Sequence, residues 1–247
     1  GNTVARCARA YRLPVWWVRR ETHHEERLCQ VRNNAVRHLA HELGHTEGRV
    51  VVIDRDMILP DHTLERHMRL GEEAPLVYAY RIDVDEDTSS ALTGDRWFAG
   101  DDTLTPTQSD LERLASRDRR YHKHLILRRA RLAPPHKPKL LGGHFSVSIQ
   151  VYLELNGFDE LYRGWGFKDD EFAYRAARRK HRVAIGVRAL PAFHLYHTTR
   201  QPDSPMRELP NARRFAGQKS LPLICEHGVR NPLPQHPVRA DEFRHGD

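Results

Sequence analysis

The sequence has few cysteines and no long hydrophobic run. Only three of its 247 residues are cysteine, and Cys7, Cys29 and Cys225 form no CxxC pair. This spacing suggests neither a disulfide framework nor a zinc knuckle. It fits a reducing compartment, so we expect a cytoplasmic protein. No apolar run of about 18 residues occurs, which predicts no membrane-spanning helix. The basic stretch 1–14 has no apolar centre, so it does not read as a signal peptide.

Acidic residues are outnumbered by basic ones, and aromatic residues are scarce. The chain has 40 Lys and Arg against 33 Asp and Glu, and 8% aromatic residues. The basic residues are spread along the chain without the interleaved aromatics of a base-stacking surface, so we expect no nucleic-acid partner. The net charge of +7 suits instead an anionic small ligand or peripheral association with an acidic membrane face.

Helix-like and strand-like patterns alternate along the chain. We expect helices over residues 2–12, 25–43, 62–70, 110–130 and 171–179, and strands over 13–19, 49–53, 76–82 and 181–187. Residues 83–106 are polar and turn-rich. The alternation predicts an α/β fold with a mostly parallel sheet flanked by helices.

The chain is long enough for one α/β domain with a full core. We assign this domain to residues 1–200. Residues 201–247 contain seven prolines and are expected to form a loosely ordered tail with one short helix.

Two aspartates follow the most hydrophobic predicted strand. The run Val50–Ile53 is typical of a strand buried in a parallel sheet, and Asp54 and Asp56 come directly after it. Open parallel sheets bind ligands at the carboxyl ends of their strands, and alternate residues of an extended segment point the same way. The two carboxylates therefore predict a Mg²⁺ or Mn²⁺ site. A second acidic run, 83–87, has no buried strand before it and is interpreted as surface loop.

Residues 140–174 carry the most specific pattern in the sequence. The order is Gly142-Gly143, a short strand, a helix ending at Asn156-Gly157, and then Gly164-Trp165-Gly166-Phe167-Lys168-Asp169-Asp170-Glu171. This order resembles the C-terminal part of galactosyltransferase-type glycosyltransferases of the GT-A fold, whose usual motif is GWGGEDD. The resemblance covers roughly residues 1–200.

The resemblance implies an inverting transfer of a hexose or N-acetylhexosamine from a UDP-sugar donor to a saccharide or other hydroxyl acceptor. By its place in the motif, Asp169 is the general base that takes the acceptor proton. Asp170 and Glu171 would orient acceptor hydroxyls. Trp165 would stack on the sugar. Because acidic residues are favoured at a helix N-terminus, Asp169 is expected to stay ionised.

Further residues are assigned to the donor and the metal by the same resemblance. Arg32 falls in an ARN-like segment and Gly143 in the Gly-Gly pair, and both are expected to lie at the donor. A histidine at the distance of His194 supplies a metal ligand in the family; His197 is the second choice. Imidazole mixed with Asp54 and Asp56 favours Mn²⁺ over Mg²⁺.

The sequence departs from the family pattern at three positions. Phe167 and Lys168 stand where the family usually has Gly and Glu, and the lysine is expected to lower the pKa of the neighbouring base. Leu140 stands where galactosyltransferases of this group carry tyrosine, which leaves N-acetylhexosamine donors open.

The family begins with a strand–helix–strand unit of roughly 30 residues that has no counterpart before Gly1. We therefore expect an N-terminally incomplete GT-A domain. Truncation, supply of the unit by a partner, and loss of catalysis remain alternative explanations.

Two other functions compete with glycosyl transfer. A non-catalytic sugar- or partner-binding module would not need the acid pair, the GWG segment and His194 together. A metal-dependent phosphotransfer enzyme would use the same aspartates, but the sequence has no P-loop or kinase signature.

Overall fold

The structure is a computed structural model that describes residues 14–20, 27–92, 104–198, 204–217, 220 and 222–243. The helix expected over residues 2–12 lies outside these ranges. The helices are α2 (Leu28–Arg37), continued by the π-helix η1 (His38–Glu42), α3 (Thr63–Glu73), α4 (Glu86–Ala91), α6 (Gln108–Arg129), α7 (Ile149–Glu154), α8 (Lys168–Arg178), the 3₁₀ turn η2 (Met206–Glu208) and α9 (Pro210–Ala216). Among the described residues, no helix is long and apolar enough to cross a membrane.

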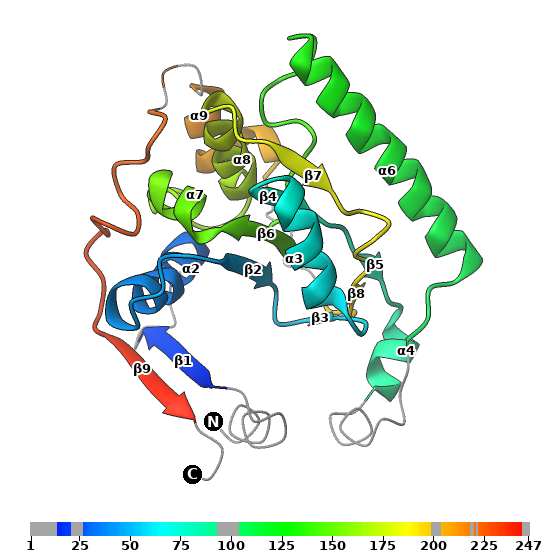
Figure 1. Ribbon diagram of the computed structural model, residues 1–247, viewed down its shortest axis with the longest axis horizontal. Helices are drawn as coiled ribbons and strands as arrows, with labels where there is room; N and C mark the ends of the chain where they lie inside the picture. The colour runs from blue at the N-terminus through cyan, green and yellow to red at the C-terminus, as the bar shows by residue number, and fades with distance from the viewer. Residues whose placement is uncertain are drawn as a thin grey trace.

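A four-stranded sheet forms the centre of the molecule (Figure 1). Its order is β2 (Arg49–Ile53), β6 (His144–Ser148), β4 (Leu76–Tyr78) and β7 (Val183–Ile185). The expectation of a mostly parallel sheet is wrong for these strands, because β6 is antiparallel to both β2 and β4, and only β4 and β7 are parallel. The reason lies at Gly143, whose carbonyl accepts from the amide of Asp54. A strand that starts beside the end of β2 must run back along it.

The strand predicted over residues 49–53 has those bounds in the structure. Its predicted burial is wrong, because β2 is an edge strand of the described sheet and is half-buried. The aliphatic run therefore indicates that these residues favour a strand. It does not indicate that the strand is buried on both faces.

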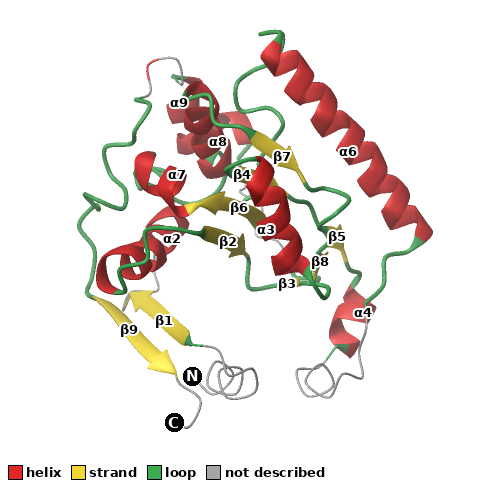
Figure 2. Ribbon diagram, in the orientation of Figure 1, coloured by secondary structure: helices red, strands yellow, loops and turns green. Residues whose placement is uncertain are grey.

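The two faces of β6 pack against different layers. Alternate side chains of a strand point to opposite faces. Phe145 packs against Phe158 and Phe172, on the side of α7 and α8 (Figure 2). Phe158 and Phe172 stack with ring centroids 4.6 Å apart. The aromatic layer anchors the segment that contains the GWG motif.

The opposite face of the sheet carries a buried polar network beneath α3. His144 Nδ1 lies 3.2 Å from the carbonyl of Tyr80, so it must donate. In neutral His144 the Nε2 atom then accepts from His67 Nε2 at 3.0 Å, and His67 Nδ1 accepts from the Ser146 hydroxyl at 2.9 Å. Arg49 donates to the same hydroxyl oxygen. Every member is satisfied only if both histidines are neutral.

A second sheet of three short strands lies beside the first. β8 (Phe193–His194) is antiparallel to β3 (Met57–Ile58) and parallel to β5 (Ile82–Asp83). This small sheet joins three segments that are distant in sequence. β5 ends in Asp83, β8 ends in His194, and Asp56 directly precedes β3.

The strand expected over residues 13–19 is β1 (Val15–Arg20), and it lies outside the central sheet. It pairs in antiparallel register with β9 (Val238–Phe243), close to the C-terminus. Other residues after 200 pack on the domain rather than forming a loose tail. Asn156 donates to the carbonyl of Cys225, and Arg37 donates to that of Val229.

Candidate functional site

Arg32 joins the acid pair to the GWG segment. Its guanidinium, on α2, donates to Asp169 Oδ1 at 3.0 Å, to Asp54 Oδ1 at 3.3 Å and to the carbonyl of Gly142 at 2.7 Å. The Arg32 side chain is 9% exposed, whereas Asp169 and Asp54 are 28% and 39% exposed. Both carboxylates are therefore held in place by a buried cation and still reach solvent.

The two glycines make this meeting of carboxylates sterically possible. A Cβ on Gly142 would overlap the carboxylate of Asp169, and one on Gly143 would overlap that of Asp54. The sequence analysis placed Gly143 at the donor by resemblance. The structure explains why both positions are glycine: the carboxylates of Asp169 and Asp54 lie where a Cβ atom would otherwise be.

The side-chain amide of Asn33, the residue after Arg32 on α2, has hydrogen-bond partners for both its oxygen and its NH₂ group. Asn33 accepts from the Tyr152 hydroxyl and the Phe158 amide, both at 2.9 Å, and donates to the Phe158 carbonyl and to Glu160. The guanidinium also lies 5.1 Å from the ring centroid of Phe158. These contacts fix α2 against the segment that precedes the GWG motif.

The direction of the pKa shift of Asp169 differs from the expectation. Burial raises the pKa of this carboxyl, and the charges of Arg32 and Lys168 oppose the rise without cancelling it. The expectation that the helix N-terminus and Lys168 would depress the pKa is therefore corrected. Lys168 is itself buried and donates to the carbonyl of Gly164.

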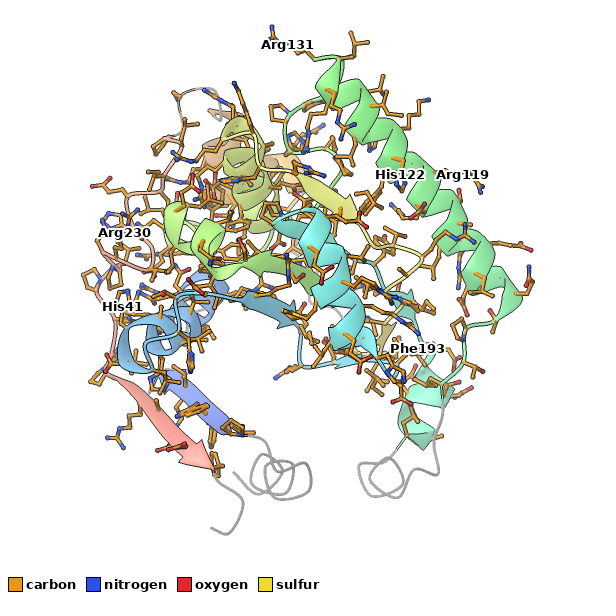
Figure 3. The ribbon with its side chains drawn as sticks, viewed as in Figure 1. His41, Arg119, His122, Arg131, Phe193 and Arg230 are labelled. Carbon is orange, nitrogen blue, oxygen red and sulfur yellow. The ribbon has the colours of Figure 1, made fainter. Side chains whose placement is uncertain are left out.

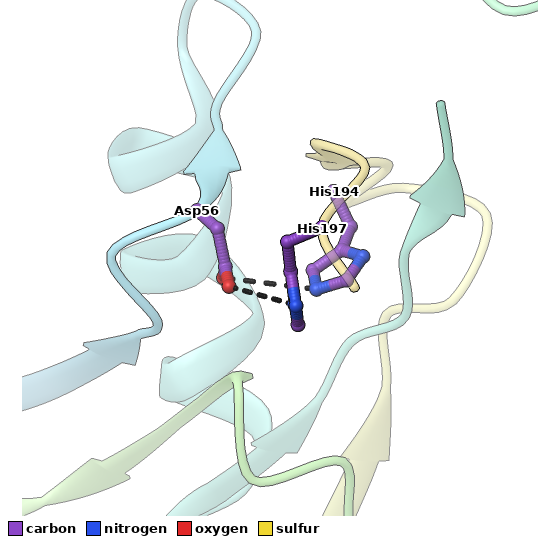
Figure 4. Close-up of side chains that lie close together, drawn as sticks. All are labelled: Asp56, His194 and His197. Carbon is purple, nitrogen blue, oxygen red and sulfur yellow. Dashed lines mark ion pairs between the residues drawn. The ribbon is translucent and has the colours of Figure 1, made fainter. Parts of the chain in front are cut away.

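A second cluster lies on the three-stranded sheet. Asp56 Oδ1 is 3.7 Å from His194 Nε2, and Asp56 Oδ2 is 3.2 Å from His197 Nε2 (Figure 4). One donor atom from each residue lies within 4.8 Å of the others, a spacing that could hold a metal ion. The sequence analysis named Asp56 and His194 as ligands, and the structure brings in its second choice, His197.

His194 has a second acidic neighbour, Asp83, which belongs to the acidic run expected to be surface loop. Asp83 Oδ1 lies 3.2 Å from His194 Nδ1, because β5 and β8 align Asp83 with His194. A carboxylate at the far nitrogen holds an imidazole in the tautomer that leaves Nε2 free to bind a metal. Asp83 lies at the surface as expected, with its side chain 71% exposed, but it is the last residue of β5 and not part of a loop.

The donor set of this cluster fits a divalent metal. Asp56 Oδ1 is buried and accepts no hydrogen bond from the described residues. Burial and the charge of Arg81 lower the pKa of His194, so its imidazole is neutral and able to bind a metal at neutral pH. Asp54, the third expected ligand, is directed to Arg32 instead.

The GWG loop presents one aromatic ring to solvent. Trp165 is 46% exposed, and its loop is held by Asn211 of α9, which donates to the carbonyls of Arg163, Trp165 and Gly166. Phe167, where the family usually has Gly, adopts a left-handed φ of 60°. Nothing in the sequence marked Asn211 as the support of this loop.

The remaining two acids of the motif differ from each other. Asp170 is 7% exposed, and its Oδ1 accepts no hydrogen bond from the described residues. Glu171 is 1% exposed and pairs with Arg175, which is also buried and donates to the carbonyls of Leu155 and Gly157. The expected substrate contact of Glu171 is corrected, because a substrate cannot reach this buried ion pair.

The comparisons with known proteins bear on the segment that carries these residues. Residues 127–198 match the family model described as the N-terminal domain of galactosyltransferase. A search of curated proteins finds no match to this chain. The matched segment includes Gly142, Asp169, His194 and His197. The chain thus contains a glycosyltransferase-related domain.

Proposed function

We propose that this protein is a metal-dependent inverting glycosyltransferase that moves a hexose or N-acetylhexosamine from a UDP-sugar to a hydroxyl acceptor. One observation carries the proposal. Asp169, which lies inside the segment similar to galactosyltransferases, meets Asp54 across Arg32. Asp56, two residues after Asp54, lies against His194 and His197 of the same matched segment.

Asp169 is the general base of the proposed reaction. The acceptor oxygen attacks the anomeric carbon, the bond from that carbon to the diphosphate oxygen breaks, and the acceptor proton passes to Asp169. A base is most effective when its pKa lies near the working pH. Burial raises the pKa of Asp169 toward neutral pH. The hydrogen bond from Arg32 favours the ionised carboxylate, which is the form that accepts a proton.

Arg32 is the positioning residue of this site. Its three contacts hold Asp169 and Asp54 a fixed distance apart, so that the base does not turn toward solvent. A guanidinium at this place also favours the negative charge of a diphosphate nearby.

Asp56, His194 and His197 would hold Mn²⁺. Carboxylate together with imidazole is a set that Mn²⁺ accepts more readily than Mg²⁺. Bound there, the ion would neutralise negative charge on the diphosphate leaving group. Asp83 would keep His194 in the ligating tautomer.

Trp165 and Asp170 are the proposed acceptor contacts. The exposed indole of Trp165 offers an apolar face to a sugar ring. Asp170 Oδ1 is left without a partner by the described residues, and a buried carboxylate oxygen without a partner is a costly feature that an acceptor hydroxyl would relieve.

The test measures UDP released from UDP-galactose, UDP-glucose and their N-acetylated forms, with Mn²⁺ and a panel of saccharide acceptors. We expect turnover with at least one donor. Asp169→Asn should lower it by about 10²- to 10⁴-fold, since the amide keeps the shape but cannot take the proton. The matched control Asp118→Asn, a half-buried acid on α6, should retain it. Equal turnover in Asp169→Asn would contradict the role of the base.

A further inference from the structure

A strongly basic cavity lies at the C-terminal end of α8, the end opposite to Asp169 and Asp170. It has a volume of about 490 Å³ and lies between the C-terminal end of α6 and the turn from α8 into β7. Its cationic lining consists of Arg128, Arg129, Arg131, Arg178, Lys180 and Arg182. None of the described residues that line it is acidic. The remaining lining is apolar apart from His181.

The positive charge of this cavity is not neutralised from within the described chain. Arg129, Arg131 and Arg182 are exposed and have no carboxylate partner there. Glu154, which contacts the lining residue His181, is also paired with Arg179. Like charges gathered around one hollow repel each other, and they create a local field that attracts an anion.

Two large apolar side chains project beside these cations. Ile126 is 64% exposed and Leu132 is 75% exposed. Ile126 lies three residues before Arg129, on the same side of α6, and Leu132 lies between the lining residues Arg131 and Ala133. Exposed aliphatic groups next to arginines are typical of a surface that enters the boundary between lipid headgroups and acyl chains.

This end of the molecule is accessible to a flat surface. α6 runs along one side of the molecule and projects at its C-terminal end (Figure 1), and Arg131 lies at that tip (Figure 3). The strands β3 and β8 of the candidate metal cluster lie near the other end of α6 (Figure 1). A helix of 22 residues is about 33 Å long, so a surface at the tip would leave the candidate metal cluster uncovered.

We propose that this basic cavity docks the protein on a membrane that carries anionic phospholipids. The headgroup phosphate enters the cavity and pairs with the arginines, while Ile126 and Leu132 reach the acyl boundary. A soluble polyanion would use the same charges but would not need the two aliphatic side chains. The proposal is independent of glycosyl transfer, since none of these residues belongs to the candidate site.

The experiment is sedimentation of the whole chain with vesicles of phosphatidylcholine, with and without phosphatidylglycerol. We expect binding only when phosphatidylglycerol is present, with loss at high salt. Each surface cation contributes about fivefold to such binding. The triple variant Arg129→Gln/Arg131→Gln/Arg182→Gln should therefore bind about a hundredfold more weakly. The matched control is Arg69→Gln/Arg213→Gln/Arg230→Gln, which removes the same charge from exposed arginines elsewhere; Arg230 lies on the opposite side of the molecule (Figure 3).

A second variant separates the membrane from a soluble polyanion. Ile126→Ser/Leu132→Ser leaves the charge unchanged and should weaken vesicle binding about tenfold or more, while binding of heparin or single-stranded DNA stays as in the parent chain. If both triple variants lose vesicle binding to the same extent, the binding depends on net charge alone and the proposal is wrong. Vesicle binding unaffected by the two serines, together with tight binding of heparin or DNA, would also overturn it. Unchanged thermal midpoints show that the variants remain folded.

Discussion

At the scale of the residue, the candidate metal cluster depends on one side chain that does not bind the metal itself. Asp83 Oδ1 lies 3.2 Å from Nδ1 of His194, and we propose that it favours the tautomer that binds the metal. Substitution of such an outer carboxylate typically weakens metal binding about 10- to 100-fold. We expect this loss for Asp83→Asn in titration calorimetry with Mn²⁺, because the amide can present its NH₂ group to Nδ1 and favour the wrong tautomer.

The control for this prediction lies in the same acidic run. Asp87 is exposed, in the first turn of α4, and Asp87→Asn removes the same charge. Asp56→Ala should abolish binding at the cluster. If Asp83→Asn binds Mn²⁺ as the unchanged chain does, Asp83 has no role in the orientation of His194.

At the scale of the element, α3 is tied to the sheet by a pair of histidines that must stay neutral. Burial lowers the pKa of His67 to about 3 and that of His144 to about 4, against 6.5 in the unfolded chain. Between these values only the unfolded state binds the protons, so the free energy of unfolding falls as the pH falls below about 6.5. The loss is at most about 1.4 kcal/mol per pH unit for each histidine, and it levels off below the folded pKa values.

Urea unfolding at a series of pH values between neutral and about pH 5 measures this slope. His67→Gln should be less stable at neutral pH but should lose less stability on acidification. His62→Gln alters an exposed histidine at the start of α3 and should keep the slope of the parent chain. An identical slope in His67→Gln would show that other groups cause the acid dependence.

At the scale of the whole molecule, a segment near the C-terminus supports the loop at the candidate site. Asn211 spans from α9 to three carbonyls of residues 163–166. Asn211→Ala removes the donor of three partly buried hydrogen bonds, at a cost of about 1 kcal/mol of unfolding free energy. We expect faster tryptic cleavage after Arg163, an exposed residue of this loop. Arg213→Ala, an exposed change on the same helix, should cleave at the parent rate; no difference between the two would remove this role of α9.

The local features of the fold could be predicted from the sequence. The bounds of β2 agree with the strand expected over residues 49–53. Gly44, which directly follows the helix expected over residues 25–43, has a φ of 72°. The order of Gly142, Asp169 and His194 carried the likeness to galactosyltransferases. These features depend on neighbouring residues or on motif order, which a single sequence contains.

Only the tertiary structure decided which side chains meet. Asp54 faces Arg32 rather than the histidines, His197 joins Asp56, and Glu171 pairs inside the core with Arg175. Asp83 reaches His194 because two strands more than a hundred residues apart align in register. Such contacts depend on strand direction and register and on which face of a helix is buried. The order of residues along one chain does not determine strand direction, register or the buried face of a helix. Packing against distant elements determines them.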